Sequence, residues 1–368
     1  MSNLVLNTCG TSLLTNLGID SDLRQLLNRS ANVQHWEDMT DACAAQLRQH
    51  VAARHQLLLG ADDVQAKQLS AEINGLLAWQ NQADWQPSGS DMYLLLATDT
   101  ALGLSTAQSI CAWLQQKGYS AQVISAEGLN TGSLDSFRQA LSSLVRQLDE
   151  LLSAYRSSGY QIQFNLTGGF KSLNGFLQAL STLYADHSFY LFEGSSEVIR
   201  IPTLPLTLDA NRLMLDHLTT FRRLSQSMPI TAAQQQSIPE LMLFRLGDDV
   251  MLSEWGELLW LSGHKSIYQQ QVLPSISERV QYGADFLSSC SGRSPELVYL
   301  INDRIAMLAA YTEGDCKLML KKLDAKPLQQ AQYKAANVWE CDLDGNHRIF
   351  MKKQGHCFTL QKVDKALH

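Results

Sequence analysis

The sequence predicts a parallel α/β domain over residues 1–206, a helical linker over 207–275 and a small α+β domain over 276–368. Three observations predict this division. Short apolar strands alternate with helical patterns in the first part. Two prolines, Pro202 and Pro205, then punctuate the chain. Closely spaced strands with hairpin turns finish it.

The first predicted domain alternates short apolar strands with helices. Its predicted strands are Leu4–Leu6, Tyr93–Ala97, Ala121–Ile124, Gln161–Phe164, Ser188–Phe192 and an edge strand at Val198–Ile201. Apolar residues recur at spacings of three and four from Phe137 to Tyr155, which predicts a helix. This alternation favours a parallel sheet covered on both faces, and ligands bind such sheets beyond the carboxyl ends of the strands.

Residues 20–85 interrupt that alternation. They are polar, follow a helical pattern and contain no clear strand, which predicts a helical insertion. Residues 207–275 are also predicted to be helical, with a Gln-rich loop near 231–237. In the last domain we expect a strand at 278–287, a helix at about 295–322, and strands at 337–343, 347–352 and 356–363, the last three joined by hairpin turns at 344–346 and 354–355.

The composition excludes several classes of protein. The chain is 45% hydrophobic and 18% charged, as globular proteins are. No apolar run reaches the roughly 18 residues that span a bilayer, and the N-terminal segment lacks a basic signal-peptide region. The seven cysteines are scattered and form no C-x-x-C pair, which argues against a disulfide framework and a structural zinc site. We therefore expect a cytoplasmic protein with no membrane partner and no metal or other cofactor.

The net charge of −7 hides an asymmetry along the chain. The segment from Lys317 to the end holds ten Lys and Arg against five Asp and Glu, a local charge of +5. The preceding residues then carry −12. A basic C-terminal segment on an acidic body can still bind a polyanion.

Two polar motifs follow predicted strands. Residues 7–12 read NTCGTS, and Gly10, Thr11 and Ser12 offer backbone N–H groups and hydroxyls to a phosphate or ribose. Residues 165–172 read NLTGGFKS, where paired glycines allow a ligand to approach the backbone and a lysine adds a cation. The candidate ligand-binding residues are Gly10, Thr11, Ser12, Thr98, Asn165, Thr167, Gly168, Gly169 and Lys171. The alternative for each motif is a polar turn that only begins a helix.

The same motifs exclude two common nucleotide-binding classes. Phe170 separates Gly169 from Lys171 and the upstream glycine is missing, so the second motif is not a Walker A loop. Residues 8–18 contain no G-x-G-x-x-G, which argues against a dehydrogenase. No pair of carboxylates suited to a metal lies beside either motif, and Asp99 in its polar turn is typical of a helix cap. The motifs therefore favour a nucleotide that is recognised rather than turned over.

With both motifs in place, residues 1–206 resemble the CRISPR-associated Rossmann-fold (CARF) sensor family. The resemblance rests on residues 7–12, residues 165–171 and the Pro-punctuated strand at 198–205. It implies a Rossmann-like α/β sensor domain that forms a homodimer and binds cyclic oligoadenylate across the two-fold axis, most commonly cyclic tetra-adenylate. It would place Gly10, Thr11 and Ser12 at one part of the ring, and residues 167–171 at another. Some members also cleave the ring.

The C-terminal segment carries a second set of candidates. Its cations suit a phosphate backbone, although a solvated face is the alternative for the lysines. Arg348 lies in a strand between apolar residues, where an arginine needs a partner. An arginine aimed at a reacting phosphate stabilises the charge of the transition state.

Residues 277–368 resemble the RelE/YoeB-type ribonuclease toxins. The resemblance rests on a helix followed by LKKL at 320–323, VWECDLDGNHRIF at 338–350, a further strand and a basic tail ending in histidine. It implies metal-independent cleavage of mRNA in the ribosomal A site, with Arg348 as the strand arginine and His368 as the catalytic C-terminal residue. Lys352 and Lys362 are the further catalytic candidates. A departure is Glu340-Cys341-Asp342, a strand that is often basic in this family.

Together the two resemblances imply a homodimeric ribonuclease of type III CRISPR defence. Cyclic oligoadenylate would activate the RelE-like domain, and the ribosome with its bound mRNA would be the partner. Two alternatives remain open. One is a CARF-type transcription regulator that binds DNA, and the other is a ring nuclease that degrades the cyclic nucleotide and leaves mRNA intact.

Overall fold

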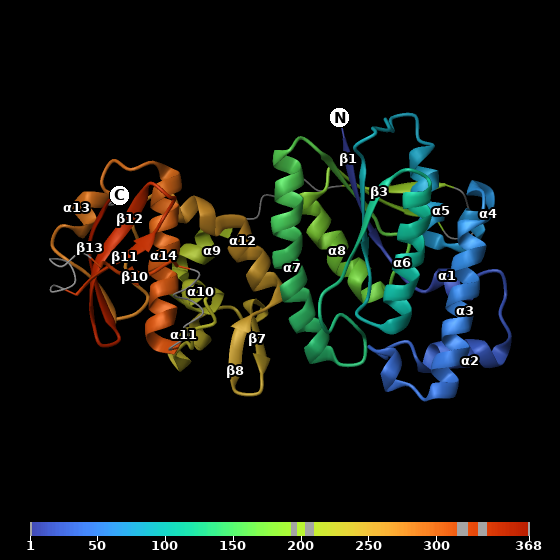
Figure 1. The fold of residues 1–368 in the computed structure, drawn as a ribbon, viewed down its shortest axis with the longest axis horizontal. Coiled ribbons are helices and arrows are strands. Elements are labelled where there is room, and N and C mark those ends of the chain that lie inside the picture. The colour runs from blue at the N-terminus through green and yellow to red at the C-terminus, as the bar shows by residue number, and fades with distance from the viewer. Residues whose placement is uncertain (1, 193–196, 203–209, 315–322, 330–336, 367–368) are drawn as a thin grey trace. The chain divides into compact units, whose positions relative to one another are not determined.

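The structure is a computed structural model that describes residues 2–192, 197–202, 210–314, 323–329 and 337–366. The chain divides into two compact units, Met1–Thr207 and Leu208–His368 (Figure 1). Each unit has its own buried apolar core. Within the described ranges no helix combines the length and apolarity needed to cross a bilayer.

The first unit is built on a six-stranded, mostly parallel sheet. Its strands are β1 Asn3–Thr8, β2 Met92–Leu96, β3 Ser120–Ile124, β4 Gln161–Asn165, β5 His187–Leu191 and β6 Val198–Ile201. The spatial order is β3-β2-β1-β4-β5-β6, with β1 to β5 parallel and β6 antiparallel to β5. The predicted parallel α/β architecture is confirmed. The strand order reverses between β1 and β4, which is where open α/β sheets bind ligands.

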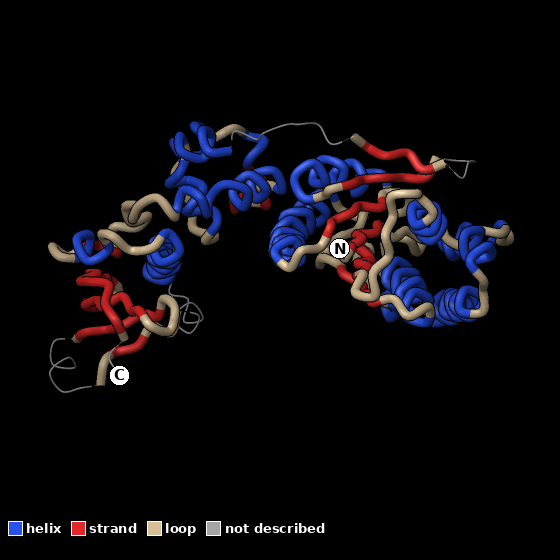
Figure 2. The backbone as a smooth tube through the Cα atoms, turned by 90° about the horizontal axis from the view of Figure 1, so that it is seen from above, coloured by secondary structure: helices blue, strands red, loops and turns tan. Residues whose placement is uncertain are grey.

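Helices cover both faces of this sheet. They are α1 Ser12–Thr15, α6 Ala101–Gln116, α7 Leu134–Ser157 and α8 Lys171–Tyr184, together with those of the insertion. Helix α6 lies on one side and α7 and α8 on the other, as right-handed crossovers require (Figure 1). Seen from above, the red strands run between two layers of blue helices (Figure 2).

The insertion is helical, as predicted. It contains α2 Ser21–Arg29, the 3₁₀ turn η1 Trp36–Asp38, α3 Asp41–Leu59, α4 Asp63–Leu69 and α5 Ala71–Gln80. Helix α5 contacts β4, β5 and β6, so the insertion supplies part of the cover of the sheet. Its last turn places Trp79 flat on Phe189 of β5, with ring centroids 4.3 Å apart. The Trp79 indole N–H also donates to Gln163.

A row of buried amides lies on β1 and β4, where an apolar row would be usual. The four side chains are Asn3, Asn7, Gln163 and Asn165, each at most 3% exposed. Gln163 donates to the side-chain oxygen of Asn3, and Asn165 to that of Asn7, both at 2.9 Å. Because each amide finds a partner, the row is compatible with burial.

The second unit joins short helices to a mixed sheet. Its helices are α9 Ala210–Asp216, α10 Leu218–Ser225, α11 Ala232–Ser237, α12 Glu254–Tyr268, α13 Phe286–Cys290 and α14 Pro295–Gly314, with a 3₁₀ turn η2 at Glu240–Met242. Its strands are β7 Leu243–Leu246, β8 Asp249–Leu252, β9 Val280–Tyr282, β10 Lys326–Pro327, β11 Val338–Asp342, β12 His347–Gln354 and β13 Cys357–Lys365. The larger sheet has the order β10-β11-β12-β13-β9, antiparallel except for the parallel pair of β13 and β9. The predicted linker and the predicted C-terminal domain lie in this one unit.

Several predicted elements of this unit differ from the structure. The Gln-rich segment is helix α11, because Thr231 and Gln234 form a reciprocal capping box. The region predicted to be helical also contains the β7–β8 hairpin, whose turn places Gly247 at a φ of +60°. The strand predicted at 278–287 covers only β9, because the buried Phe286 begins α13. The predicted helix from about 295 is described as far as Gly314, and its remainder lies outside the described residues.

Replacing Trp79 should show how strongly the insertion holds the first unit. Trp79→Ala removes a ring that is 3% exposed and leaves a cavity above Phe189. We expect a loss of about 3–5 kcal/mol in the free energy of unfolding of this unit. Chemical denaturation followed by circular dichroism measures it. Trp36→Ala, which removes a half-buried ring beside Arg48, is the matched control and should cost clearly less. Equal losses would contradict a special role for α5.

Candidate functional site

The loops after β1 and β4 meet at the point where the strand order reverses. The Thr8 hydroxyl, at the end of β1, donates to the Gly168 carbonyl at 2.7 Å. A Cβ atom added at Gly10 would lie 3.1 Å from the Gly169 nitrogen, so the two backbones pack closely. Gly169 itself has a φ of +83°, a conformation that favours glycine. The structure thus brings the two predicted ligand-binding motifs together.

A buried carboxylate from the insertion joins these loops. Glu72, in the first turn of α5, is 2% exposed. One of its oxygens accepts a hydrogen bond from the Gly10 N–H at 2.8 Å. The other accepts from the hydroxyls of Ser12 and Ser70, both at 2.6 Å. Hydrogen bonds to a charged group contribute about 1.5–3 kcal/mol each to stability. Glu72 therefore holds the loop after β1 firmly in place.

The loop after β4 closes over the same helix. A Cβ atom at Gly168 would lie 2.3 Å from a carboxylate oxygen of Glu72. A Cβ atom at Gly75, one turn further along α5, would lie 2.2 Å from the Thr167 hydroxyl. Glu72 and Gly75 are three residues apart and therefore share one face of α5. Only glycine at positions 75 and 168 allows this helix to approach both loops.

Several predicted ligand-binding groups already have partners within the protein. Asn165 donates to Asn7 and to the Glu72 carbonyl, and its oxygen accepts from the Thr167 hydroxyl at 2.7 Å. The Thr167 hydroxyl also accepts from the Leu191 N–H. Like the Gly10 N–H and the Ser12 hydroxyl, these groups shape the loops from the inside. Their roles as ligand contacts remain predictions.

Other predicted groups lie closer to solvent. Thr11 and Gly169 are half-buried, and Lys171 is exposed at the start of α8. Lys171 lines a groove of about 570 Å³ together with Asn174, Tyr190 and Arg200. Exposed cations at a helix start suit an anionic ligand.

Thr98 and Asp99 follow β2, the neighbour of β1. The Thr98 hydroxyl lies 3.0 Å from that of Thr100, which caps α6. The Asp99 carboxylate accepts from Gln34 and from the Gly128 N–H, both at 2.8 Å. Asp99 thus fastens two loops, while its predicted cap role belongs to Thr100. Among the described residues no group of three His, Cys, Asp or Glu is placed to hold a metal ion.

Glu72 is the residue of the first unit's candidate site that the sequence analysis missed. It lies in the polar insertion, sixty positions from the loop it holds, and no motif marks it. The available signals were Ser70, which caps α5, and Gly75, which interrupts the helix interior where alanine would be more stable. Neither indicates that the helix reaches the ends of β1 and β4.

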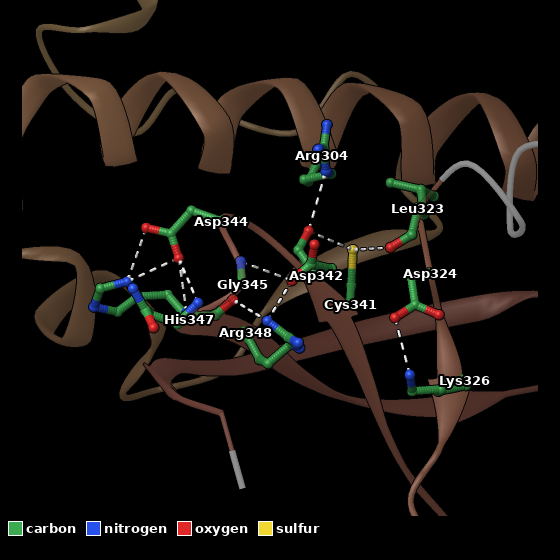
Figure 3. Close-up of polar contacts among 11 residues, drawn as sticks. Arg304, Leu323, Asp324, Lys326, Cys341, Asp342, Asp344, Gly345, His347 and Arg348 are labelled. Carbon is green, nitrogen blue, oxygen red and sulfur yellow. Dashed lines mark hydrogen bonds and ion pairs between the residues drawn. The ribbon is translucent and has the colours of Figure 1, made fainter. Parts of the chain in front are cut away.

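The second candidate site lies on the sheet of the second unit (Figure 3). Arg348, on β12, forms an ion pair with Asp342, its cross-strand neighbour on β11. It also donates to the His347 carbonyl at 3.0 Å, and its neighbour on β13 is Asp364. The partner that a strand arginine needs is therefore Asp342. This aspartate belongs to the Glu340-Cys341-Asp342 segment, which is often basic in the RelE/YoeB family. His347, which the sequence analysis did not single out, pairs with Asp344 at 3.0 Å.

The other catalytic candidates differ in their surroundings. Lys362 pairs with Asp364 at 2.6 Å, and both side chains are about half exposed. Lys352 is exposed on β12. His368 lies outside the described residues. Lys353, one of the C-terminal cations, places its ammonium 4.4 Å from the Trp339 ring centroid and 5.5 Å from those of Tyr311 and Phe358. Cation–π attraction thus holds Lys353 within the unit.

The loop cysteine provides a chemical test of this site. Burial raises the pKa of the Cys9 thiol well above its usual value, and the nearby Glu72 carboxylate raises it further. Cys9 should therefore stay a neutral thiol at pH 8, while the exposed Cys357 reacts. We expect iodoacetamide to label Cys357 and spare Cys9 in the folded protein, as mass spectrometry of peptides would show. Labelling of Cys9 at the rate of Cys357 would contradict the buried arrangement, and labelling in urea is the control.

One comparison with known proteins gives a family match that lies within the first unit. Residues 67–204 match the model of the family described as CRISPR-associated protein (Cas_APE2256). That segment includes α5 with Glu72 and the loop after β4, but not the loop after β1. Among solved structures, Enterococcus italicus Csm6 bound to cyclic hexa-2'-fluoro-hexa-dAMP matches at 12% identity, with 68% of this chain and 60% of that chain covered and a TM-score of 0.26. The chain therefore spans less than two thirds of that protein. A search of curated proteins found no match.

Proposed function

We propose that this protein is a ribonuclease of type III CRISPR defence that cyclic oligoadenylate activates to cleave mRNA in the ribosomal A site. The observation that carries the CRISPR part of this proposal is the match of residues 67–204 to a CRISPR-associated family. That segment provides one of the two loops at the reversal point of a Rossmann-type sheet. The resemblance of residues 1–206 to CARF sensors supports the sensor part of the proposal, and the resemblance of residues 277–368 to RelE/YoeB-type toxins supports the ribonuclease part.

In this proposal the first unit is the sensor. Two copies would bind one ring, most commonly cyclic tetra-adenylate, beyond the carboxyl ends of β1 and β4. Lys171 would attract the phosphates, and Thr11 and Gly169 would contact the ring from the solvent side of the loops. The ligand activates the protein only if it binds the active arrangement more tightly than the inactive one.

The second unit would act on mRNA without a metal. The 2′-oxygen of the RNA attacks the adjacent phosphorus while the bond from phosphorus to the 5′-oxygen breaks. A base takes the 2′-hydroxyl proton and an acid protonates the leaving 5′-oxygen, which gives a cyclic phosphate and a free 5′-hydroxyl. Arg348 would stabilise the charged phosphate during this step, with Lys352, Lys362 and His368 as the other proposed groups. RNA would have to compete with Asp342 for Arg348.

The whole proposal can be tested in a translating extract. We expect mRNA cuts at A-site codons that appear only when cyclic tetra-adenylate or cyclic hexa-adenylate is added, mapped at nucleotide resolution by primer extension. Loss of the ring nucleotide with intact mRNA would support the ring-nuclease alternative instead. Ring binding without cuts, together with tight binding of a DNA site, would support the transcription regulator. Failure to bind either ring would contradict the sensor assignment.

Arg348 is the sharpest test of the nuclease assignment. Arg348→Ala should lower the cleavage rate by about 10²–10³-fold, the usual effect of removing one group that stabilises a transition state. Arg348→Lys keeps a charge beside Asp342 but loses the planar fork, so it should also be slow. Arg245→Ala, an exposed arginine of the same unit that bonds only Gln235 among the described residues, is the matched control. Full activity in Arg348→Ala protein with an unchanged melting temperature would overturn the assignment.

A further inference from the structure

We propose that Glu72 is a positioning residue for the ligand site at the carboxyl ends of β1 and β4, an inference that rests on the proposed sensor function. Its carboxylate holds residues 9–12 in the conformation that the ligand meets. The Glu72 carboxylate accepts the hydrogen bonds of the Gly10 N–H and the Ser12 hydroxyl, which point into the protein. The outer side of the loop therefore presents an uncharged surface to a ribose or base. The phosphates of the ring are then left to Lys171.

The hydrogen bonds of the carboxylate support this role. Glu72 accepts from Gly10, Ser12 and Ser70, which come from two separate segments of the chain. A further hydrogen bond links the same two segments, because the Ser12 hydroxyl oxygen accepts from the Ala71 N–H at 3.0 Å. The start of α5 and the loop after β1 are thus joined in both directions. The loop cannot move without breaking several of these bonds.

The burial of Glu72 indicates that the Gly10 N–H and the serine hydroxyls bonded to it are not the groups that bind a phosphate. An anion normally binds the free N–H groups that follow a strand. Here the Gly10 N–H is already satisfied by a carboxylate that is 2% exposed and covered by Gly168. A phosphate at the same place would meet a like charge in a setting where water screens little. Lys171, by contrast, is exposed beside the loop after β4.

The competing view is that Glu72 is a removable substitute for the ligand. In that case a phosphate would displace the carboxylate and take over its donors. The two views differ in the sign of one effect. Removal of the carboxylate weakens ring binding if Glu72 positions the loop, and strengthens it if Glu72 competes with a phosphate.

The experiment measures binding of cyclic tetra-adenylate and cyclic hexa-adenylate to the full chain by isothermal titration calorimetry. Glu72→Ala should weaken binding by about tenfold or more, whereas Glu72→Gln should stay within about threefold of the unchanged protein. Glutamine can keep all three bonds, because its oxygen accepts from Gly10 and its amide donates to the two serine hydroxyls, which can also accept. Gln80→Ala is the matched control, since it removes a bond from α5 to Tyr93 away from the loops.

A second readout does not depend on the ligand. Amide hydrogen exchange in residues 9–12 and 166–169 should be faster in Glu72→Ala than in Glu72→Gln or Gln80→Ala. If Glu72→Ala does not fold, Ser70→Ala removes one bond to the carboxylate and should weaken binding in the same direction.

The outcomes separate the inference from the proposed function. Tighter binding by either Glu72 variant, or unchanged binding and exchange in Glu72→Ala, would overturn the positioning role. If the unchanged protein binds neither ring, the sensor proposal fails, and the exchange data still decide whether Glu72 fixes the loops.

Discussion

The carboxylate of Glu72 is the contact on which the ligand-facing edge of the first unit depends. It joins the insertion to the loop after β1, and the loop after β4 packs against it. A carboxylate buried without a cation is costly unless neutral donors satisfy it, and here one backbone N–H and two hydroxyls do so. Removing it would leave those donors unpaired at a cost of about 1–3 kcal/mol each. The polar contact therefore specifies where α5 must lie.

The amide row beneath α5 extends the same principle along the sheet. Gln163 receives the Trp79 indole N–H, and Asn165 donates to the Glu72 carbonyl. Apolar contacts between Trp79 and Phe189 hold the helix on the sheet, but a flat stack tolerates sliding. The directed bonds of the amides do not, because a shift of the helix would leave buried polar groups unpaired. The buried apolar contact thus holds α5 against the sheet, while the hydrogen bonds of the amides fix its position.

Among the described residues of the second unit, several C-terminal cations pair with nearby carboxylates. The excess of lysines and arginines after Lys317 suggested a surface for a phosphate backbone. Yet Arg348 pairs with Asp342 across the neighbouring strands β12 and β11, and Lys362 pairs with Asp364 along the single strand β13. The Lys362–Asp364 pair is about half exposed, and such a pair contributes only about 0–1 kcal/mol, so a polyanion can displace it. The Arg348 side chain is more enclosed, so a phosphate must bind it more strongly than Asp342 does in order to displace that carboxylate.

The sequence by itself determined the elements that depend on local pattern. Alternating apolar strands and helices indicated the parallel sheet, and the polar turns after Leu6 and Phe164 lay where the strands end. The capping box at Thr231 was also in the sequence, although the Gln-rich composition around it favoured a loop. Tertiary structure alone decided that Glu72 reaches Gly10 and that Asp342 faces Arg348. The first contact depends on how a separate helix docks and the second on the register of two strands, and neither leaves a periodic signal in the residues nearby.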